Sequence, residues 1–194
     1  MSIPVGLESL IAQQEITNLC YRYARGSDRL DAKSFAAAFW DDGVFNQLNS
    51  GRPMPDFAHQ LLGIMGQNFA LTHHLNGNIL IDFVDEDHAT TEVYFRAFHL
   101  TNPEMTEANA QFLIGERRLR ELSHVDGNVY DIVVGGRYLD QVERRDRIWK
   151  IKSRRLIFDY CTVEHSAALR MGEGMTAMGA GMMARDQTDP SYLP

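Results

Sequence analysis

The sequence has few cysteines, no long hydrophobic run and no signal for secretion. Its two cysteines, Cys20 and Cys161, form no pair at the spacing of metal ligands, so we expect two buried thiols and neither a disulfide framework nor a zinc site. No apolar run is long enough to cross a bilayer, and the first residues lack the basic and apolar regions of a signal peptide. These absences predict a cytoplasmic protein.

Basic residues are also in short supply. The chain has 19 Lys and Arg against 26 Asp and Glu, a formal net charge of −7, so no sequence-wide basic field attracts phosphates. We therefore expect neither nucleic acid nor an anionic membrane as a partner. The chain also lacks a GxGxxG turn, a phosphate loop, a GxSxG elbow and an HExxH or HxH pair, so we expect no cofactor and no metal.

The composition is that of an ordinary globular domain. With 194 residues, 44% of them hydrophobic and 23% charged, the chain can form a full core. We expect one domain over residues 1–163 and a C-terminal arm, rich in methionine and glycine, over 164–194. The arm either packs on its own sheet or a second subunit, or covers an apolar ligand. Four of its methionines follow one another at helical steps of 4, 3 and 4: Met171, Met175, Met178 and Met182.

The first part of the chain has the apolar spacing of helices. Apolar residues recur three and four positions apart, and residues that favour helix ends stand between the periodic segments. The predicted helices are 7–25, ended by Gly26 and Ser27; 32–40, capped by Asp31; and 57–67, capped by Asp56.

The second part alternates β-branched and aromatic residues with polar ones, as strands do. Short connections within each pair favour an antiparallel meander. Residues 103–127, between the two pairs, have helical spacing and predict one inserted helix. The fold class is therefore α+β. The predicted strands are 43–48, 74–84, 88–100, 128–144 and 147–160.

A few polar residues are expected to face the interior of such a domain. Asp28 follows the first predicted helix, one turn beyond Tyr23, where an aspartate most simply caps a helix or forms a turn. His73 and His74 are adjacent in a strand, so only one of them faces inward. His99 ends the partner strand and would approach the same interior. By themselves these residues do not define a site.

Three segments together resemble the SnoaL-like family, within the fold of scytalone dehydratase and nuclear transport factor. They are YRYARGSDRLDAKSFAAAFWDDGVF, THHLNGNILIDFVDEDHATTEVYFRAFH and GGRYLDQVERRDRIWKIKSRRLIFDY. The resemblance extends over residues 7 to 160 and implies a cone-shaped α+β barrel of the cystatin-like type. In such a barrel, three N-terminal helices pack on a curved antiparallel sheet.

The resemblance also implies a set of catalytic residues. Asp28 is similar to the pocket aspartate that scytalone dehydratase, hexachlorocyclohexane dehydrochlorinase and bile-acid dehydratase carry after their first helix. His74 resembles their catalytic histidine. Tyr23 falls where bile-acid dehydratase has its tyrosine, and His99 falls where scytalone dehydratase has a second histidine. These four positions are the expected catalytic residues.

Other positions depart from scytalone dehydratase. Its extra tyrosines would fall at Ser27 and Gln47, and its later serine and asparagine at Gly136 and Tyr138. The substrate is therefore expected to differ from scytalone. Tyr138, Gln47 and Phe45 are the expected substrate contacts.

The resemblance favours a cofactor-independent lyase (dehydratase) or isomerase. In this hypothesis His74 takes a proton from a hydrophobic cyclic substrate, Asp28 fixes the histidine tautomer, and Tyr23 and His99 donate hydrogen bonds. One alternative is a non-catalytic module that binds an apolar small molecule. Another is the small subunit of a ring-hydroxylating dioxygenase, which needs a large partner. The resemblance further implies a homodimer or homotrimer.

Overall fold

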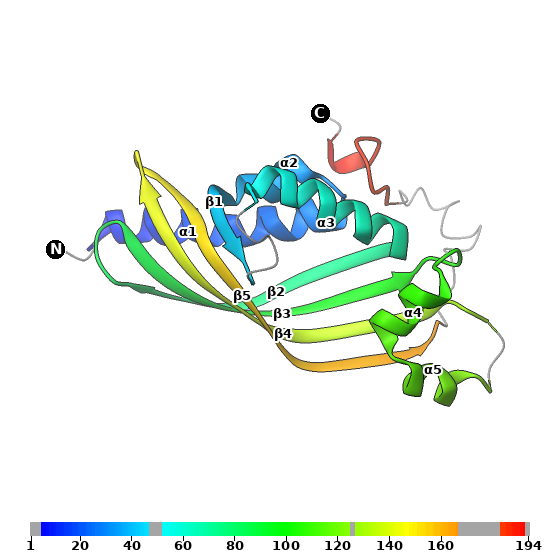
Figure 1. Cartoon of the computed structure of the whole chain (residues 1–194). Coiled ribbons are helices and arrows are strands. Elements are labelled where there is room, and N and C mark those ends of the chain that lie inside the picture. Colours follow the sequence, from blue (N-terminus) through cyan, green and yellow to red (C-terminus); the bar gives the residue numbers. More distant parts are fainter. Residues whose placement is uncertain (1–4, 47–51, 125–126, 167–182, 193–194) are drawn as a thin grey trace, which may run out of the picture.

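The computed structural model describes residues 5–46, 52–124, 127–166 and 183–192, and it confirms the α+β class. A strongly curved sheet holds three helices on its concave side, and two further helices lie at one end (Figure 1). The helices are α1 Leu7–Asp28, α2 Ala32–Ala37, α3 Met54–Asn68, α4 Glu107–Ile114 and α5 Glu116–Leu122. The strands are β1 Phe39–Phe45, β2 Phe69–Phe83, β3 His88–Thr101, β4 Tyr130–Arg145 and β5 Ile148–His165.

The sheet has the strand order β1-β5-β4-β3-β2. Strands β2 to β5 form the predicted antiparallel meander, whereas β1 pairs in parallel with β5 at the edge. The β4–β5 hairpin turns through Asp146 and Arg147, which have φ values of 49° and 66°. Two consecutive left-handed residues match the twist of the flanking strands and allow a tight turn.

Irregularities in strand pairing accompany the curvature of the sheet. The register between β4 and β5 shifts at Gly135 and Gly136, and a Cβ atom on Gly136 would lie 2.0 Å from the carbonyl oxygen of Ile157. Only glycine fits this close approach. A second shift lies in β2, between Asn76 and Ile79. Such bulges bend and twist a strand, which helps this sheet to wrap around its helices.

The first helix is longer than the sequence predicts. It continues through Gly26 and Ser27 to Asp28, and Leu30, with φ 52°, follows it in the left-handed conformation. Gly26 does not end the helix. It permits close packing instead, because a Cβ atom there would lie 2.6 Å from the backbone nitrogen of Phe35 in α2. Asp28 is thus the last helical residue, not a residue beyond the helix.

Other predicted boundaries also shift. The helix predicted over 32–40 ends at Ala37, because the chain turns at once into β1. Asp31 caps it as predicted, accepting a hydrogen bond from the backbone nitrogen of Ser34. Asp56 is not a cap, since α3 begins two residues earlier at Met54. The inserted segment forms two helices, α4 and α5, which Gly115 separates with φ 88°.

The main core lies between helices α1 to α3 and the concave face of the sheet. Tyr23, Phe35, Phe39 and Phe45 pack ring against ring, with centroids 4.8 to 6.4 Å apart. Aromatic pairs at such distances add to the free energy of burial. This aromatic cluster anchors the tip of α1 and the edge strand β1 to each other.

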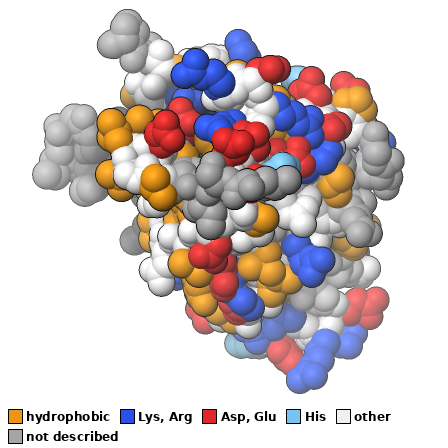
Figure 2. Space-filling view, turned by 90° about the vertical axis from the view of Figure 1, so that its left-hand side faces the viewer, with side chains coloured by type: hydrophobic (Ala, Val, Ile, Leu, Met, Phe, Trp, Pro, Cys, Tyr) orange, Lys and Arg blue, Asp and Glu red, His pale blue; other side chains and the backbone are white. Residues whose placement is uncertain are grey.

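The surface shows no one-signed charged face at the end of the molecule that carries the strand turns. Acidic and basic side chains are interspersed there (Figure 2). They include the ion pairs of Arg144 with Asp87, at 2.8 Å, and of Arg145 with Asp42, at 3.0 Å. In the described ranges, none of the helices combines the length and the apolar run that a membrane crossing needs.

The C-terminal residues 183–192 return to the end of α1. Arg29 pairs with Asp189 at 3.1 Å, and the Tyr192 hydroxyl donates to Asp31 at 2.8 Å. The guanidinium of Arg25 lies 4.0 Å from the centre of the Tyr192 ring. Strand β5 continues to His165, past the predicted end of the domain at residue 163. The four methionines at helical steps lie outside the described residues.

Candidate functional site

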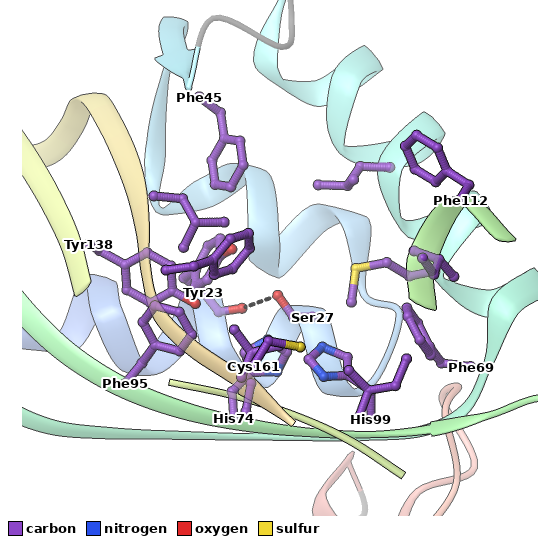
Figure 3. Close-up of a pocket in the computed structure, with 18 residues that line it drawn as sticks. Tyr23, Ser27, Phe45, Phe69, His74, Phe95, His99, Phe112, Tyr138 and Cys161 are labelled. Carbon is purple, nitrogen blue, oxygen red and sulfur yellow. Dashed lines mark hydrogen bonds between the residues drawn. The ribbon is translucent and has the colours of Figure 1, made fainter. Parts of the chain in front are cut away.

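A cavity of about 380 Å³ lies between the helices and the concave face of the sheet. Its walls are largely aromatic and aliphatic, with a phenylalanine from each of β1, β2, β3, α4 and β5 (Figure 3). Polar side chains are few among them. They are Tyr23, Ser27, His74, His99, Tyr138 and Cys161.

Strand β2 brings His74 to this cavity and turns His73 away. Side chains alternate along the strand, so that Thr72 is buried, His73 is exposed and His74 lines the cavity. The carboxylate of Asp28, at the end of α1, meets His74 with 2.7 Å between Oδ1 and the ring Nδ1. The pairing of α1 with β2 therefore selects His74 as the inward histidine.

Asp28 is held as a carboxylate by three donors. The Thr72 hydroxyl donates to Oδ1 at 3.0 Å, the backbone nitrogen of His74 donates to Oδ2 at 2.9 Å, and the His74 ring supplies the third bond. Burial by itself would raise the pKa of Asp28, but the hydrogen bonds from His74 and Thr72 outweigh burial and lower it. Because Asp28 is ionised, Nδ1 of His74 donates to it, and in the neutral form of the ring Nε2 carries the lone pair.

His99 lies beside His74 with the two rings edge to face, 5.5 Å between their centres. Burial and then the nearby His74 lower the pKa of His99 from 6.5 to about 4, although a hydrogen bond to the Ile132 backbone and the charge of Asp28 oppose the shift. His99 is therefore a neutral imidazole at neutral pH. Its Nδ1 is buried and has no hydrogen-bond partner among the described residues.

The neutral state of His99 predicts a pH dependence of stability. The unfolded chain binds the His99 proton below pH 6.5 and the folded chain only below about 4, so the free energy of unfolding falls as pH drops through this window. We expect His99 to account for a loss of about 2 kcal/mol between pH 7 and 5. Urea unfolding of His99→Gln should lack this loss. The same change at exposed His59 should leave the pH slope as it is, and equal slopes for all three proteins would contradict the expectation.

Tyr23 and Tyr138 form one wall of the cavity, with ring centres 5.4 Å apart. Burial raises the pKa of both hydroxyls, so both stay protonated and able to donate a hydrogen bond. The guanidinium of Arg154 lies 4.2 Å from the centre of each ring. It stacks on the two tyrosines and limits how far they can move.

An ion pair that the sequence patterns did not predict holds Arg154. Its Nε and one terminal nitrogen donate to the two oxygens of Asp140 at 2.8 and 2.7 Å. Both side chains are buried, at 0% and 1% exposure. The sequence does contain an indication of this ion pair, because the alternation of inward and outward residues along β4 places Asp140 on the buried side. A carboxylate there needs a cation opposite, and the sheet register pairs it with Arg154.

The structure brings most of the predicted site residues together. Tyr23, His74, His99, Tyr138 and Phe45 line the cavity, and Asp28 supports it through His74. Gln47 lies outside the described residues. The prediction of two buried thiols holds for Cys20 and is wrong for Cys161, which is exposed and lines the open cavity. Within the described part of the chain, no cluster of three or more His, Cys, Asp or Glu is placed to hold a metal ion.

Comparison with known proteins assigns the family. Residues 8–155 match the SnoaL-like domain. The chain belongs to the SnoaL-like family. No curated protein sequence matches this SnoaL-like protein.

Solved structures share the fold of this SnoaL-like protein. Hexachlorocyclohexane dehydrochlorinase LinA-type3 from Novosphingobium barchaimii superposes with a TM-score of 0.62 at 19% identity, over 84% of this chain and 95% of that one. A scytalone dehydratase-like protein from Novosphingobium aromaticivorans has a TM-score of 0.59 at 26% identity, over 82% and 91%. A cystatin-like protein of unknown function from Nostoc punctiforme has a TM-score of 0.53 at 22% identity, over 82% and 96%. The cystatin-like cone is thus the fold of this chain.

Proposed function

We propose that this SnoaL-like protein is a cofactor-independent lyase or isomerase that acts on a hydrophobic cyclic substrate. The observation that carries the proposal is the pair of Asp28 and His74 at an apolar cavity. An ionised carboxylate holds the proton on Nδ1, so Nε2 is left as a base. The names of similar proteins, a dehydrochlorinase and a scytalone dehydratase-like protein, add support, because both refer to eliminations.

In the proposed reaction, Nε2 of His74 takes a proton from an acidic C–H bond of the substrate. The electron pair of that bond forms a double bond, and either a leaving group departs with its electrons or a proton returns at another carbon. Asp28 stabilises the imidazolium that forms. Tyr23, Tyr138 and neutral His99 surround the same cavity, where a hydroxyl or ring N–H can stabilise negative charge on a carbonyl oxygen or a leaving group.

The walls of the cavity favour an uncharged substrate. The described residues that line it include no lysine, arginine, aspartate or glutamate, so a carboxylate or phosphate group would lose its water without gaining an ion pair from them. The nearby cation Arg154 is already engaged by Asp140. A cyclic ketone or enol with few polar groups matches this lining best.

Deuterium exchange tests the proposal without knowledge of the natural leaving group. Cyclic ketones are incubated with the protein in D₂O, and incorporation at the acidic carbon is followed by mass spectrometry. We expect at least one ketone to exchange about 10²- to 10⁴-fold faster than with His74→Ala, the usual range for general-base catalysis. Ketones that bind, as judged by a raised melting temperature, but never exchange would contradict it.

The second candidate is a module that binds an apolar molecule without changing it. The apolar cavity walls favour it, as does Phe112, which lines the cavity and is 88% exposed. The same experiment separates the two, because binding without exchange is the result expected for a binding module. Purification of the chain alone as a soluble homodimer would argue against the dioxygenase small subunit.

A further inference from the structure

The described C-terminal residues place an arginine against the support of the histidine pair. In Figure 3 the faint red ribbon of this segment runs beyond the strands that carry His74 and His99. Arg185 projects from it to the junction of α1 and β2. Its Nε donates to the carbonyl oxygen of Asp28 at 3.2 Å, one terminal nitrogen donates to the carbonyl oxygen of Phe69, and the other donates to the Thr72 hydroxyl at 3.2 Å.

A series of hydrogen bonds connects Arg185 to the pair of Asp28 and His74. The Thr72 hydroxyl accepts from Arg185 and donates to Oδ1 of Asp28, the same oxygen that meets Nδ1 of His74. A hydroxyl that accepts from a cation has its own proton free for the carboxylate. Arg185 also holds the backbone of α1 at Asp28 and of β2 at Phe69, the two elements whose approach sets the distance between Asp28 and His74.

The C-terminal segment holds Arg185 in this position. Asp189 accepts from the backbone nitrogen of Ala184 at 3.0 Å and pairs with Arg29 of the α1 end at 3.1 Å. Three residues further along, Tyr192 donates to Asp31. The guanidinium therefore approaches from a segment fixed on both sides, and Arg185 is not among the residues that line the cavity.

We propose that Arg185 is a positioning residue for the Asp28–His74 pair, acting through Thr72 and the backbone of α1 and β2. The inference deepens the proposed function, because a positioned base matters only if His74 is the base. Since Arg185 acts from outside the cavity, its loss changes the alignment of the base and not the contacts with substrate. We expect Arg185→Ala to lower kcat about 10- to 100-fold with little change in KM, as small misplacements of reacting groups do.

The test with the sharpest readout is the NMR signal of the His74 Nδ1 proton, which a short bond to a carboxylate shifts downfield and protects from exchange. Loss of this signal in His74→Gln assigns it. We expect Arg185→Ala to broaden or abolish the signal, and Arg185→Lys to restore part of it. Arg117→Ala is the matched control, because it removes the same charge from a side chain that is 90% exposed and pairs only with Glu121 among the described residues.

A second variant covers the case in which Arg185→Ala does not fold. Thr72→Val keeps the shape of the buried side chain but removes the hydroxyl between Arg185 and Asp28, and it should weaken the same signal. An unchanged signal in folded Arg185→Ala, or in folded Thr72→Val, overturns the inference. Its failure is distinct from failure of the proposed function, since the signal reports the geometry of the pair whether or not any ketone reacts.

Discussion

Replacement of His74 by alanine is expected to lower kcat/KM by about 10²- to 10⁴-fold while the protein remains folded. His74 lines the cavity and is the base in the proposed reaction, and general-base catalysis contributes this range. The assay is the rate of deuterium exchange or turnover of the best ketone, with circular dichroism to verify the fold. The loss should appear in kcat more than in KM, because the ring acts on the reacting proton.

The adjacent histidine provides a matched control for this experiment. His73→Ala removes the same side chain from the exposed face of the same strand, and its activity should stay within about twofold of the wild type. Asp28→Asn should fall between the two, because the amide keeps the shape but no longer stabilises the imidazolium. Full turnover by His74→Ala would refute the mechanism, whatever the other variants do.

Replacement of Asp140 by asparagine is expected to have the largest effect on stability. It leaves the charge of Arg154 buried without its partner, and breaking a buried ion pair in this way costs about 3–5 kcal/mol in the free energy of unfolding. Urea unfolding at pH 7 measures the change. Asp42→Asn is the control, because Asp42 pairs with Arg145 and Lys152 at the surface, where it is 57% exposed, and such pairs contribute less than about 1 kcal/mol.

A double variant separates loss of the ion pair from a packing defect. Asp140→Leu with Arg154→Met removes both charges, and apolar replacements of a buried pair are often neutral or stabilising. We expect it to be more stable than Asp140→Asn. If the single variant loses no more stability than Asp42→Asn, the buried charge is better solvated than the geometry indicates, and the expectation fails.

Local patterns were enough to predict most of the fold. The spacing of apolar residues in α1 and the alternation in β3 are signals within one element, and both elements formed, α1 extending past its predicted end to Asp28. The ends of the helices were harder to predict. Gly26, for example, is needed because α2 approaches α1 closely there, and it does not end the helix. The parallel pairing of β1 with β5 joins segments far apart in the sequence, so no local sequence pattern predicts it.

Local patterns predicted less of the candidate site than of the fold. Asp28, His74, Tyr23 and His99 came from the family resemblance, since each of them alone is an unremarkable polar residue. Alternation by itself would mislead at the histidines, because counting back by twos from the core residue Ile79 points to His73. Arg185 escaped prediction because it reaches the pair from the far end of the chain.

The bulge in β2 affects the size of the ligand that the cavity can hold. Gly77 and Asn78 are consecutive outward residues between Asn76 and Ile79, against a single outward residue on β3. Deleting one of them would leave every inward side chain inward and only straighten the strand. Adding or removing one residue at this bulge would then widen or narrow the cavity without replacing any residue that lines it. The length of β2 can therefore set the size of molecule that this cavity accepts while its lining residues stay the same.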